Sequence, residues 1–188
     1  MLKSTFIVVL GASLASAQGV TENSGPKQAT YISEEEVQTV LKLAPPAADK
    51  QIKVVDAGKY NVGVGILHRG KIAARADGSV AGIAHHEITE TYIVVSGAGV
   101  LATGGTIEGG AESPADSEIT KVLAGPSLSG TVKSGFATRT VKTGDIVVIP
   151  PNVFHGWVRV DDHVDYLSVR PDPGRVLPAG YVNPVIKK

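Results

Sequence analysis

The sequence predicts an all-β protein, a sandwich or a closed barrel, with one short helix before the strands. Short apolar segments recur along the chain, and Gly, Pro, Asn or Asp separates most of them. The 22 glycines and 11 prolines are spread along the chain, as turns between many strands require. No helical periodicity lies between the segments, which argues against a parallel α/β sheet. The predicted strands are 52–55, 60–67, 81–84, 91–96, 122–123, 138–141, 146–149, 157–160 and 164–169.

The one predicted helix spans about residues 34–43. Ser33 and the three glutamates that follow it have the form of a capping box, with acidic residues in the first turn. Apolar residues then follow at helical spacing. Pro45 and Pro46 end the pattern, because proline cannot continue a helix.

The N-terminus has the pattern of a secretory signal peptide. Lys3 supplies a positive charge, an apolar stretch begins at Phe6, and the small residues Ala15-Ser16-Ala17 form a cleavage site before Gln18. The apolar stretch is shorter than the ~20 residues that a membrane span needs. We therefore expect a signal peptide over residues 1–17 and a secreted protein, either extracellular or periplasmic.

The rest of the chain is predicted to form one domain with short extensions. Residues 18–50 are interpreted as a leader with the short helix, residues 51–170 as the barrel, and residues 171–188, with four prolines, as an extended tail. Within the barrel, residues 98–135 are rich in Gly, Ser and Thr. We interpret that stretch as a long insertion between two halves of the barrel.

Composition limits the classes of partner. The 18 basic residues balance the 18 acidic residues, so no net charge attracts nucleic acid or an anionic membrane, and neither is expected as a partner. The absence of cysteine excludes disulfides, thiolate ligands and a thiol nucleophile. Stability must come from the core, which the 43 % apolar residues can supply, and from any bound metal.

Histidine and glutamate side chains suggest a metal site. His85 and His86 precede Glu90, and His155 lies far along the chain. In a strand alternate residues share a face, so positions 86, 90 and 92 point one way and positions 85 and 93 the other. A metal held by two imidazoles and one carboxylate keeps open coordination positions, and this ligand set is associated with non-haem iron. Mn, Ni, Cu or Zn fit comparable ligands. Each residue alone is as consistent with a surface or core position, but an unpaired buried carboxylate would be costly.

Two segments carry a resemblance to a known family. Glu90 is followed after six residues by Gly97, and Gly144 is followed after five residues by Pro150 and then by His155. These spacings resemble the two short motifs of the cupins. The resemblance implies a jelly-roll barrel, also called a double-stranded β-helix, and a divalent metal held by His86, Glu90 and His155. It also implies a homodimer paired through the outer sheets.

The chain departs from the cupin motifs at three positions. Ala84 stands where the first motif histidine would be, Asn152 replaces a glycine, and Arg159 replaces an asparagine. Asparagine tolerates positive φ better than most residues, so the turn at Asn152 can persist. The role of His85 stays open: either a β-bulge turns it inward as a further ligand, or the site has three protein ligands.

Two functions follow from this pattern. The first is a metal-dependent enzyme acting on a small organic molecule, of the dioxygenase, oxidase or lyase type, with Glu90 and Tyr92 as candidate catalytic residues. Tyr92 shares the parity of Glu90 and either faces the cavity or packs as core. The second is a binding, storage or structural cupin without catalysis. Sugar binding ranks last, because aromatic residues make up 5 % of the chain and Trp157 is its one tryptophan.

Overall fold

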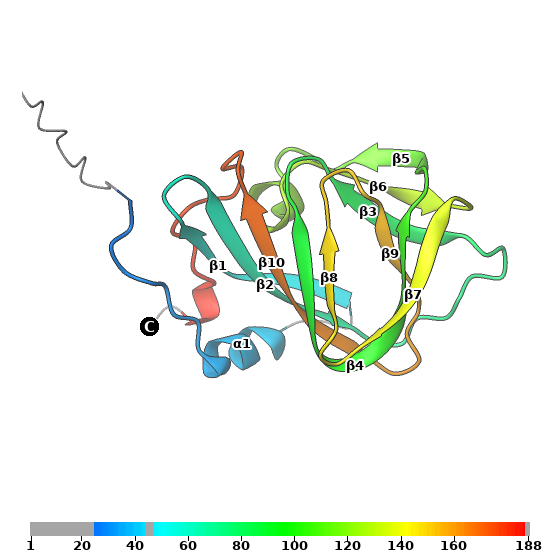
Figure 1. Ribbon diagram of the computed structural model, residues 1–188, viewed down its shortest axis with the longest axis horizontal. Coiled ribbons are helices and arrows are strands. Elements are labelled where there is room, and N and C mark those ends of the chain that lie inside the picture. The colour runs from blue at the N-terminus through cyan, green and yellow to red at the C-terminus, as the bar shows by residue number, and fades with distance from the viewer. Residues whose placement is uncertain (1–24, 44–46, 187–188) are drawn as a thin grey trace, which may run out of the picture.

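The protein, as a computed structural model, forms a ten-stranded antiparallel sheet that curls into a half-barrel, with one short α-helix on the N-terminal side (Figure 1). The structure describes residues 25–43 and 47–186, so the expected signal peptide at 1–17 lies outside the described residues. The prediction of an all-β fold with a short N-terminal helix is confirmed. The elements are α1 (Glu34–Leu41), β1 (Ala47–Asp56), β2 (Asn61–Arg69), β3 (Val80–His85), β4 (Glu90–Gly104), β5 (Glu108–Glu112), a π-helical turn (Ile119–Leu123), β6 (Ser127–Val132), β7 (Phe136–Lys142), β8 (Ile146–Ile149), β9 (His155–Arg159), β10 (Val164–Asp172) and a 3-10 turn (Pro184–Ile186).

Helix α1 begins at the predicted capping box. The Glu36 backbone N–H donates to Ser33 Oγ at 3.1 Å, and the Ser33 N–H donates back to Glu36 Oε2 at 3.0 Å. These two bonds satisfy backbone donors that the first turn leaves without partners. Val40 is fully buried against Ile52 of β1 and Ile66 of β2. The helix therefore covers the face of β1 and β2 that points away from the barrel interior.

Strand β4 is the element on which the curl depends. It is 15 residues long and pairs with four other strands. Its first part pairs with β8 and β10, and its second part pairs with β7 and β9. The full order is β1-β2-β10-β4-β9-β3-β6-β5, with β7 and β8 also bound to β4. Because both halves of the sheet share β4, a bend in this strand turns them to face each other (Figure 1).

The bend in β4 lies at Gly97. Its φ is +71°, which L-residues with a Cβ rarely adopt, and a Cβ there would lie 2.0 Å from the carbonyl oxygen of His163. Just before it the register against β10 slips by one residue, between Val94 and Ser96. Such an irregularity bends a strand and increases its twist. Gly97, which the cupin resemblance singled out, thus allows the sheet to curl around its interior.

The interior of the half-barrel is filled by side chains from both halves. The larger cluster includes Leu67, Tyr92, Leu101 and Tyr166, with Trp157 packed against it. Tyr92 and Tyr166 have ring centroids 4.2 Å apart. Side chains on alternate positions of β4 and β10 therefore form the wall beside which the candidate site lies.

Two sequence predictions are corrected here. Residues 98–135 are not an insertion: residues 98–104 complete β4, and β5, β6 and the π-helical turn occupy most of the remainder. Residues 122–123, predicted as a strand, belong to that turn. Glycine-rich strands read as loops because glycine has low strand propensity. At Gly99 the reason for glycine is packing, since a Cβ would lie 2.7 Å from the Trp157 ring.

The tail after β10 packs against the barrel. Leu177 is buried with Val54 and Ile88, and Val182 forms a β-bridge with Lys53 of β1. Among the described residues, no helix has both the length and the apolar character needed to span a membrane.

We predict that Gly97→Ala destabilises the fold more than Gly78→Ala does. Both glycines have a φ of +71°, but a Cβ at Gly78 would meet no atom within 4 Å. Gly78→Ala should cost ~1–2 kcal/mol of unfolding free energy from backbone strain alone. Gly97→Ala adds a steric conflict with the backbone carbonyl of His163, just before β10, worth ~1–3 kcal/mol more. Urea denaturation of the two variants measures the difference, and equal losses would contradict the role of Gly97 in the bend.

Candidate metal centre

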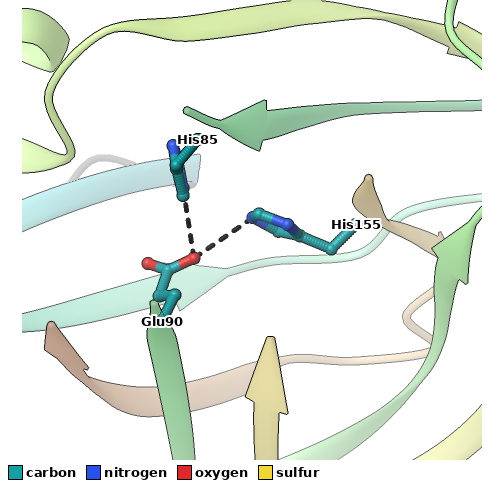
Figure 2. Close-up of side chains that lie close together, drawn as sticks. All are labelled: His85, Glu90 and His155. Atoms are coloured by element: carbon teal, nitrogen blue, oxygen red, sulfur yellow. Dashed lines mark hydrogen bonds and ion pairs between the residues drawn. The ribbon is translucent and has the colours of Figure 1, made fainter. Parts of the chain in front are cut away.

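Three buried side chains converge at the ends of three strands. His85 is the last residue of β3, Glu90 is the first of β4, and His155 is the first of β9. Figure 2 shows both imidazoles directed at one carboxylate oxygen. His85 Nε2 lies 3.3 Å from Glu90 Oε2, and His155 Nε2 lies 3.1 Å from the same oxygen. The side chains of His85, Glu90 and His155 are 6 %, 2 % and 4 % exposed, so all three are buried.

The sheet pairing brings the three residues together. His155 lies opposite Ile83 of β3 on one side and opposite Thr103 of β4 on the other. Residues 86–89 form the turn that joins the end of β3 to the start of β4. The local sequence therefore fixes the distance between His85 and Glu90, and the curl of the sheet adds His155.

His86, expected from strand parity to be a ligand, is not part of this cluster. Its side chain is 34 % exposed, its Nε2 lies 2.8 Å from Glu112 Oε2, and its Nδ1 lies 3.1 Å from Asn152 Oδ1. The parity argument fails because β3 ends at His85, and the turn that follows interrupts the alternation counted back from Glu90. His85 takes the inward position instead. Among the expected ligands, the structure brings together His85, Glu90 and His155.

Hydrogen bonds on the far sides of both rings determine where their protons lie. His155 Nδ1 is 3.1 Å from the Val153 carbonyl oxygen, which can only accept, so Nδ1 carries a proton. His85 Nδ1 is 2.8 Å from Ser127 Oγ, whose own proton is donated to the Gly125 carbonyl oxygen at 2.9 Å. Ser127 therefore accepts from His85 Nδ1. In their neutral forms both rings direct an unprotonated Nε2 at Glu90.

This arrangement requires a cation among the three groups. Two Nε2 lone pairs and one carboxylate oxygen face one another at 3.1–3.3 Å, and none of the three carries a proton when the rings are neutral. Buried acceptors without donors are costly, so either protons or a metal ion must lie between them. Histidine Nε2 with Nδ1–H held by a second partner is the usual form of a metal ligand in proteins. The donor set thus fits a divalent metal.

Arg170 keeps Glu90 ionised. Glu90 Oε1 accepts from Arg170 Nε at 3.0 Å, from Arg170 Nη2 at 2.8 Å and from Ser168 Oγ at 2.7 Å. Burial by itself would raise the pKa of Glu90, but the adjacent Arg170 charge is the largest of the opposing effects that hold that pKa well below its usual value. The carboxylate is therefore a charged ligand at neutral pH, with Oε1 bound to the protein and Oε2 directed at the imidazoles.

Arg170 is itself fully buried and fully bound. Its Nη2 pairs with Asp49, and its Nη1 donates to Gln51 Oε1 at 2.9 Å and to the Leu123 carbonyl oxygen at 3.0 Å. No sequence motif indicated Arg170 as part of the site. Its signal was the alternation along β10, where residues 164, 166, 168, 170 and 172 all point inward and are buried. A charged residue within that inward series indicates a buried ion pair.

Burial shifts the pKa values of two other groups in the site, His85 and Tyr92, in opposite directions. Burial lowers the pKa of His85 and outweighs the opposing attraction of Glu90, so this ring is neutral and available as a ligand at neutral pH. Burial raises the pKa of Tyr92 well above its usual value, so its phenol stays protonated. Tyr92 lies beside the centre, with its ring edge toward His155 at a centroid distance of 6.0 Å. The sequence left the cavity and the core open for Tyr92, and the structure combines the two, since Tyr92 lines the cavity and also packs in the core cluster.

Two adjoining cavities give access to the centre. A cavity of about 110 Å³ is lined by His85, Glu90 and His155. A second cavity of about 270 Å³ is lined on one side by His155 as well. Both are also lined by Arg69, Ile83 and Tyr92, so they meet at these residues. A small molecule can therefore occupy space next to the three candidate ligands.

Comparison with known proteins gives similarity of fold only. No family model and no curated protein matches the sequence. A Bacillus halodurans structure is 14 % identical and covers 84 % of this chain and 90 % of its own, with a TM-score of 0.47. A second structure is that of an uncharacterized conserved protein with a double-stranded β-helix domain from Klebsiella pneumoniae. It is 17 % identical, and the match covers 79 % of this chain and 94 % of that protein, with a TM-score of 0.40. An oxalate oxidase in complex with glycolate is 16 % identical. The match covers 71 % of this chain and 55 % of that protein, with a TM-score of 0.40.

One of these neighbours is described as having a double-stranded β-helix domain, which is the fold that the cupin resemblance implies. The likeness is distant and concerns architecture.

We predict that Arg170→Met lowers the free energy of unfolding of the metal-free protein by ~3–5 kcal/mol at neutral pH, because it leaves the Glu90 charge buried without its partner. In the wild type the folded pKa of Glu90 lies below the usual 4.5, so its ionised form contributes stability that is lost as pH falls through the folded pKa. In the variant we expect the folded pKa of Glu90 to lie above 4.5, because the buried carboxylate has lost its positive partner. Protonating Glu90 at low pH then removes the cost of that buried, unpaired charge. The stability gap should therefore shrink as pH falls.

Arg175→Met is the matched control. It breaks an ion pair between two exposed side chains, Arg175 at 40 % and Asp56 at 47 % exposure. The loss should lower the free energy of unfolding by ~0–1 kcal/mol. Urea denaturation with chelator present, from pH 7 down to pH 4, measures both variants. A pH-independent gap for Arg170→Met would show that the Glu90 charge is not what Arg170 stabilises.

Proposed function

We propose that this protein is a metal-dependent cupin-type enzyme that acts on a small organic molecule, with one divalent metal held by His85, Glu90 and His155. The observation that carries the proposal is the position of two imidazole Nε2 atoms 3.3 and 3.1 Å from one buried carboxylate oxygen, while the Nδ1 of each ring has a hydrogen-bond partner of its own. Neutral rings held in this tautomer leave that oxygen without a donor, and a bound metal ion would compensate for this. Here the second partners, Ser127 and the Val153 carbonyl, place the protons on the far side of each ring.

The ligand set indicates the kind of metal. Two imidazoles and one carboxylate suit Fe, Mn, Ni, Cu or Zn, and the absence of cysteine from the chain excludes a thiolate site. When bound, such an ion supplies a Lewis acid and, for the redox-active metals, electron transfer. Three protein ligands leave positions for other molecules, as catalytic sites do and closed structural sites do not.

The residues around the centre have roles that do not depend on the identity of the metal. Ser127 and the Val153 carbonyl hold the imidazoles in the ligating tautomer, and Arg170 holds Glu90 ionised and oriented. Tyr92, with its phenol protonated, forms the wall between the centre and the larger cavity. We propose that Tyr92 orients the substrate by hydrogen bonding, and that Glu90 acts as a ligand rather than as a proton carrier, since both of its oxygens are engaged.

The reaction is proposed to be oxidative, of the dioxygenase or oxidase type, or non-oxidative, of the lyase type, and the metal decides between them. A non-catalytic binding cupin is the second candidate. The observation that favours it is Ala84, which stands where the cupin motif has a further histidine and provides no ligand. Secretion and the homodimer stay predictions from the sequence.

We predict that the chain from Gln18 to Lys188, purified without chelator, contains about one equivalent of a divalent metal. His85→Asn and His155→Asn should each weaken binding of added Zn²⁺ by more than the ~10–100-fold that follows from loss of a supporting outer-shell group. His86→Asn is the matched control and should bind Zn²⁺ as the wild type does, because the His86 side chain lies outside the cluster.

Elemental mass spectrometry and calorimetric titration with Zn²⁺ measure these effects, and circular dichroism confirms that each variant is folded. Binding should also weaken as pH falls, because both imidazoles must be neutral to ligate. Loss of metal in His86→Asn, with retention in His85→Asn, would overturn the assignment. No binding of any of the five metals by the wild type would favour the non-catalytic function.

A further inference from the structure

The larger cavity is separate from the metal ligands except at one wall. Its volume is about 270 Å³, and it lies among the end of β2, residues 70–79, and strands β3, β9 and β10. His155 and Tyr92 line it and also line the smaller cavity at the centre. A molecule that fills the larger cavity therefore contacts a ligand residue while most of its surface lies elsewhere. The walls of this cavity thus determine which molecules reach the centre.

The charged side chains that line this cavity are all of one sign, positive. Arg69 and Arg75 line it, and no aspartate or glutamate does. The chain as a whole has 18 basic and 18 acidic residues, so this local excess does not follow from composition. Arginine stays protonated at any physiological pH, and two guanidinium groups at a partly enclosed wall attract an anion. Of the two acids of the smaller cavity, Glu90 is paired with Arg170, and Asp49 is paired with Arg170 and also attracts Arg69.

The two arginines are placed differently. Arg69 is the last residue of β2, where its backbone is paired with Val164 of β10, and its half-buried side chain interacts with the Tyr166 phenol. Arg75 is exposed on the segment that leads to β3. The nearest acid in sequence, Asp77, uses its Oδ1 to accept from the Ser79 N–H at 3.0 Å and the Ser79 hydroxyl at 2.7 Å. Arg69 is thus a fixed contact inside the cavity, and Arg75 an entry contact.

The remaining wall is apolar and aromatic. Ile72, Leu101, Val158 and Trp157 contribute to it, together with the tyrosines already named. A wall of this kind accommodates a short hydrocarbon or aromatic body, and the guanidinium groups require an anionic end. A planar guanidinium can bind a planar carboxylate through two parallel N–H···O hydrogen bonds.

We propose that the substrate is a small organic acid with an apolar body, whose carboxylate is bound by Arg69 after passing Arg75, in the cavity beside the metal centre. The proposal rests on the proposed function in assigning this molecule as a substrate. The binding of the acid by Arg69 does not depend on the metal. This difference allows the two proposals to fail separately.

The test compares acids with their neutral amides, which have nearly the same shape. Acetate, butyrate and benzoate, each with its amide, are titrated into the wild-type chain loaded with Zn²⁺ and into metal-free His155→Asn. At least one acid should bind the wild type roughly 10- to 100-fold more tightly than its amide, as expected for a hydrogen-bonded charge pair. The preference for the acid should persist in the metal-free variant.

Arginine variants identify the residue responsible. Arg69→Gln should remove the preference for the acid, Arg69→Lys should keep part of it, and Arg75→Gln should slow association more than it weakens binding. Arg159→Gln is the matched control, since Arg159 pairs with exposed Asp161 and does not line this cavity. Thermal unfolding confirms that each variant is folded.

The outcomes separate the two proposals. Binding of Zn²⁺ with no preference for any of the three acids over its amide, or a preference that survives Arg69→Gln, overturns this inference and leaves the metal centre standing. A preference for the acid that depends on Arg69, in a chain that binds no metal, supports the anion site and overturns the enzyme.

Discussion

The pairing of Glu90 with Arg170 is the interaction on which the site depends. A carboxylate that is 2 % exposed would normally take up a proton, and a protonated Glu90 is a poor metal ligand. Arg170 contributes two donors to Oε1 and so leaves Oε2 charged and directed at the imidazoles. The same guanidinium contacts Asp49, Gln51 and the Leu123 carbonyl, so β1, β4, β10 and the π-helical turn all meet at one buried charge. The geometry of the centre and the packing of the barrel are therefore linked.

The fold places the remaining ligands by a simple device. All three ligands lie at strand ends, and the bend of β4 at Gly97 brings the two halves of the sheet close enough for those ends to meet. Ser127 and the Val153 carbonyl then set the tautomer of each ring. The three side chains thus provide the ligand atoms for a metal. Their hydrogen-bond partners fix the protonation state of each ligand. Functional sites that are supported in this way keep their geometry when empty, since these hydrogen-bond partners are independent of the ion.

Sequence patterns predicted the parts of this account that depend on local spacing. The capping box at Ser33 and the alternation of most strands are local, and the spacings around Glu90 and His155 indicated both residues as ligands. Strand parity favoured His86 and left the role of His85 open, because the inward position depends on the exact residue at which β3 ends. Arg170 was missed because its partners, Asp49 and Glu90, are about 120 and 80 residues away in the chain. The glycine-rich strands β5 and β6 were taken for an insertion because glycine hides the alternation that identifies a strand.

The most direct test of the account is the protonation state of the two imidazoles, read from the ¹⁵N chemical shifts of the ring nitrogens with and without Zn²⁺. The rings of His85 and His155 can be assigned from the signals lost in His85→Asn and His155→Asn. The account predicts that, with Zn²⁺ bound, Nδ1 of both rings carries a proton and Nε2 of both rings has the shift of a metal-bound nitrogen. Rings that keep a proton on Nε2 in the presence of Zn²⁺ would contradict it, because the cluster would then be a proton-bridged part of the core.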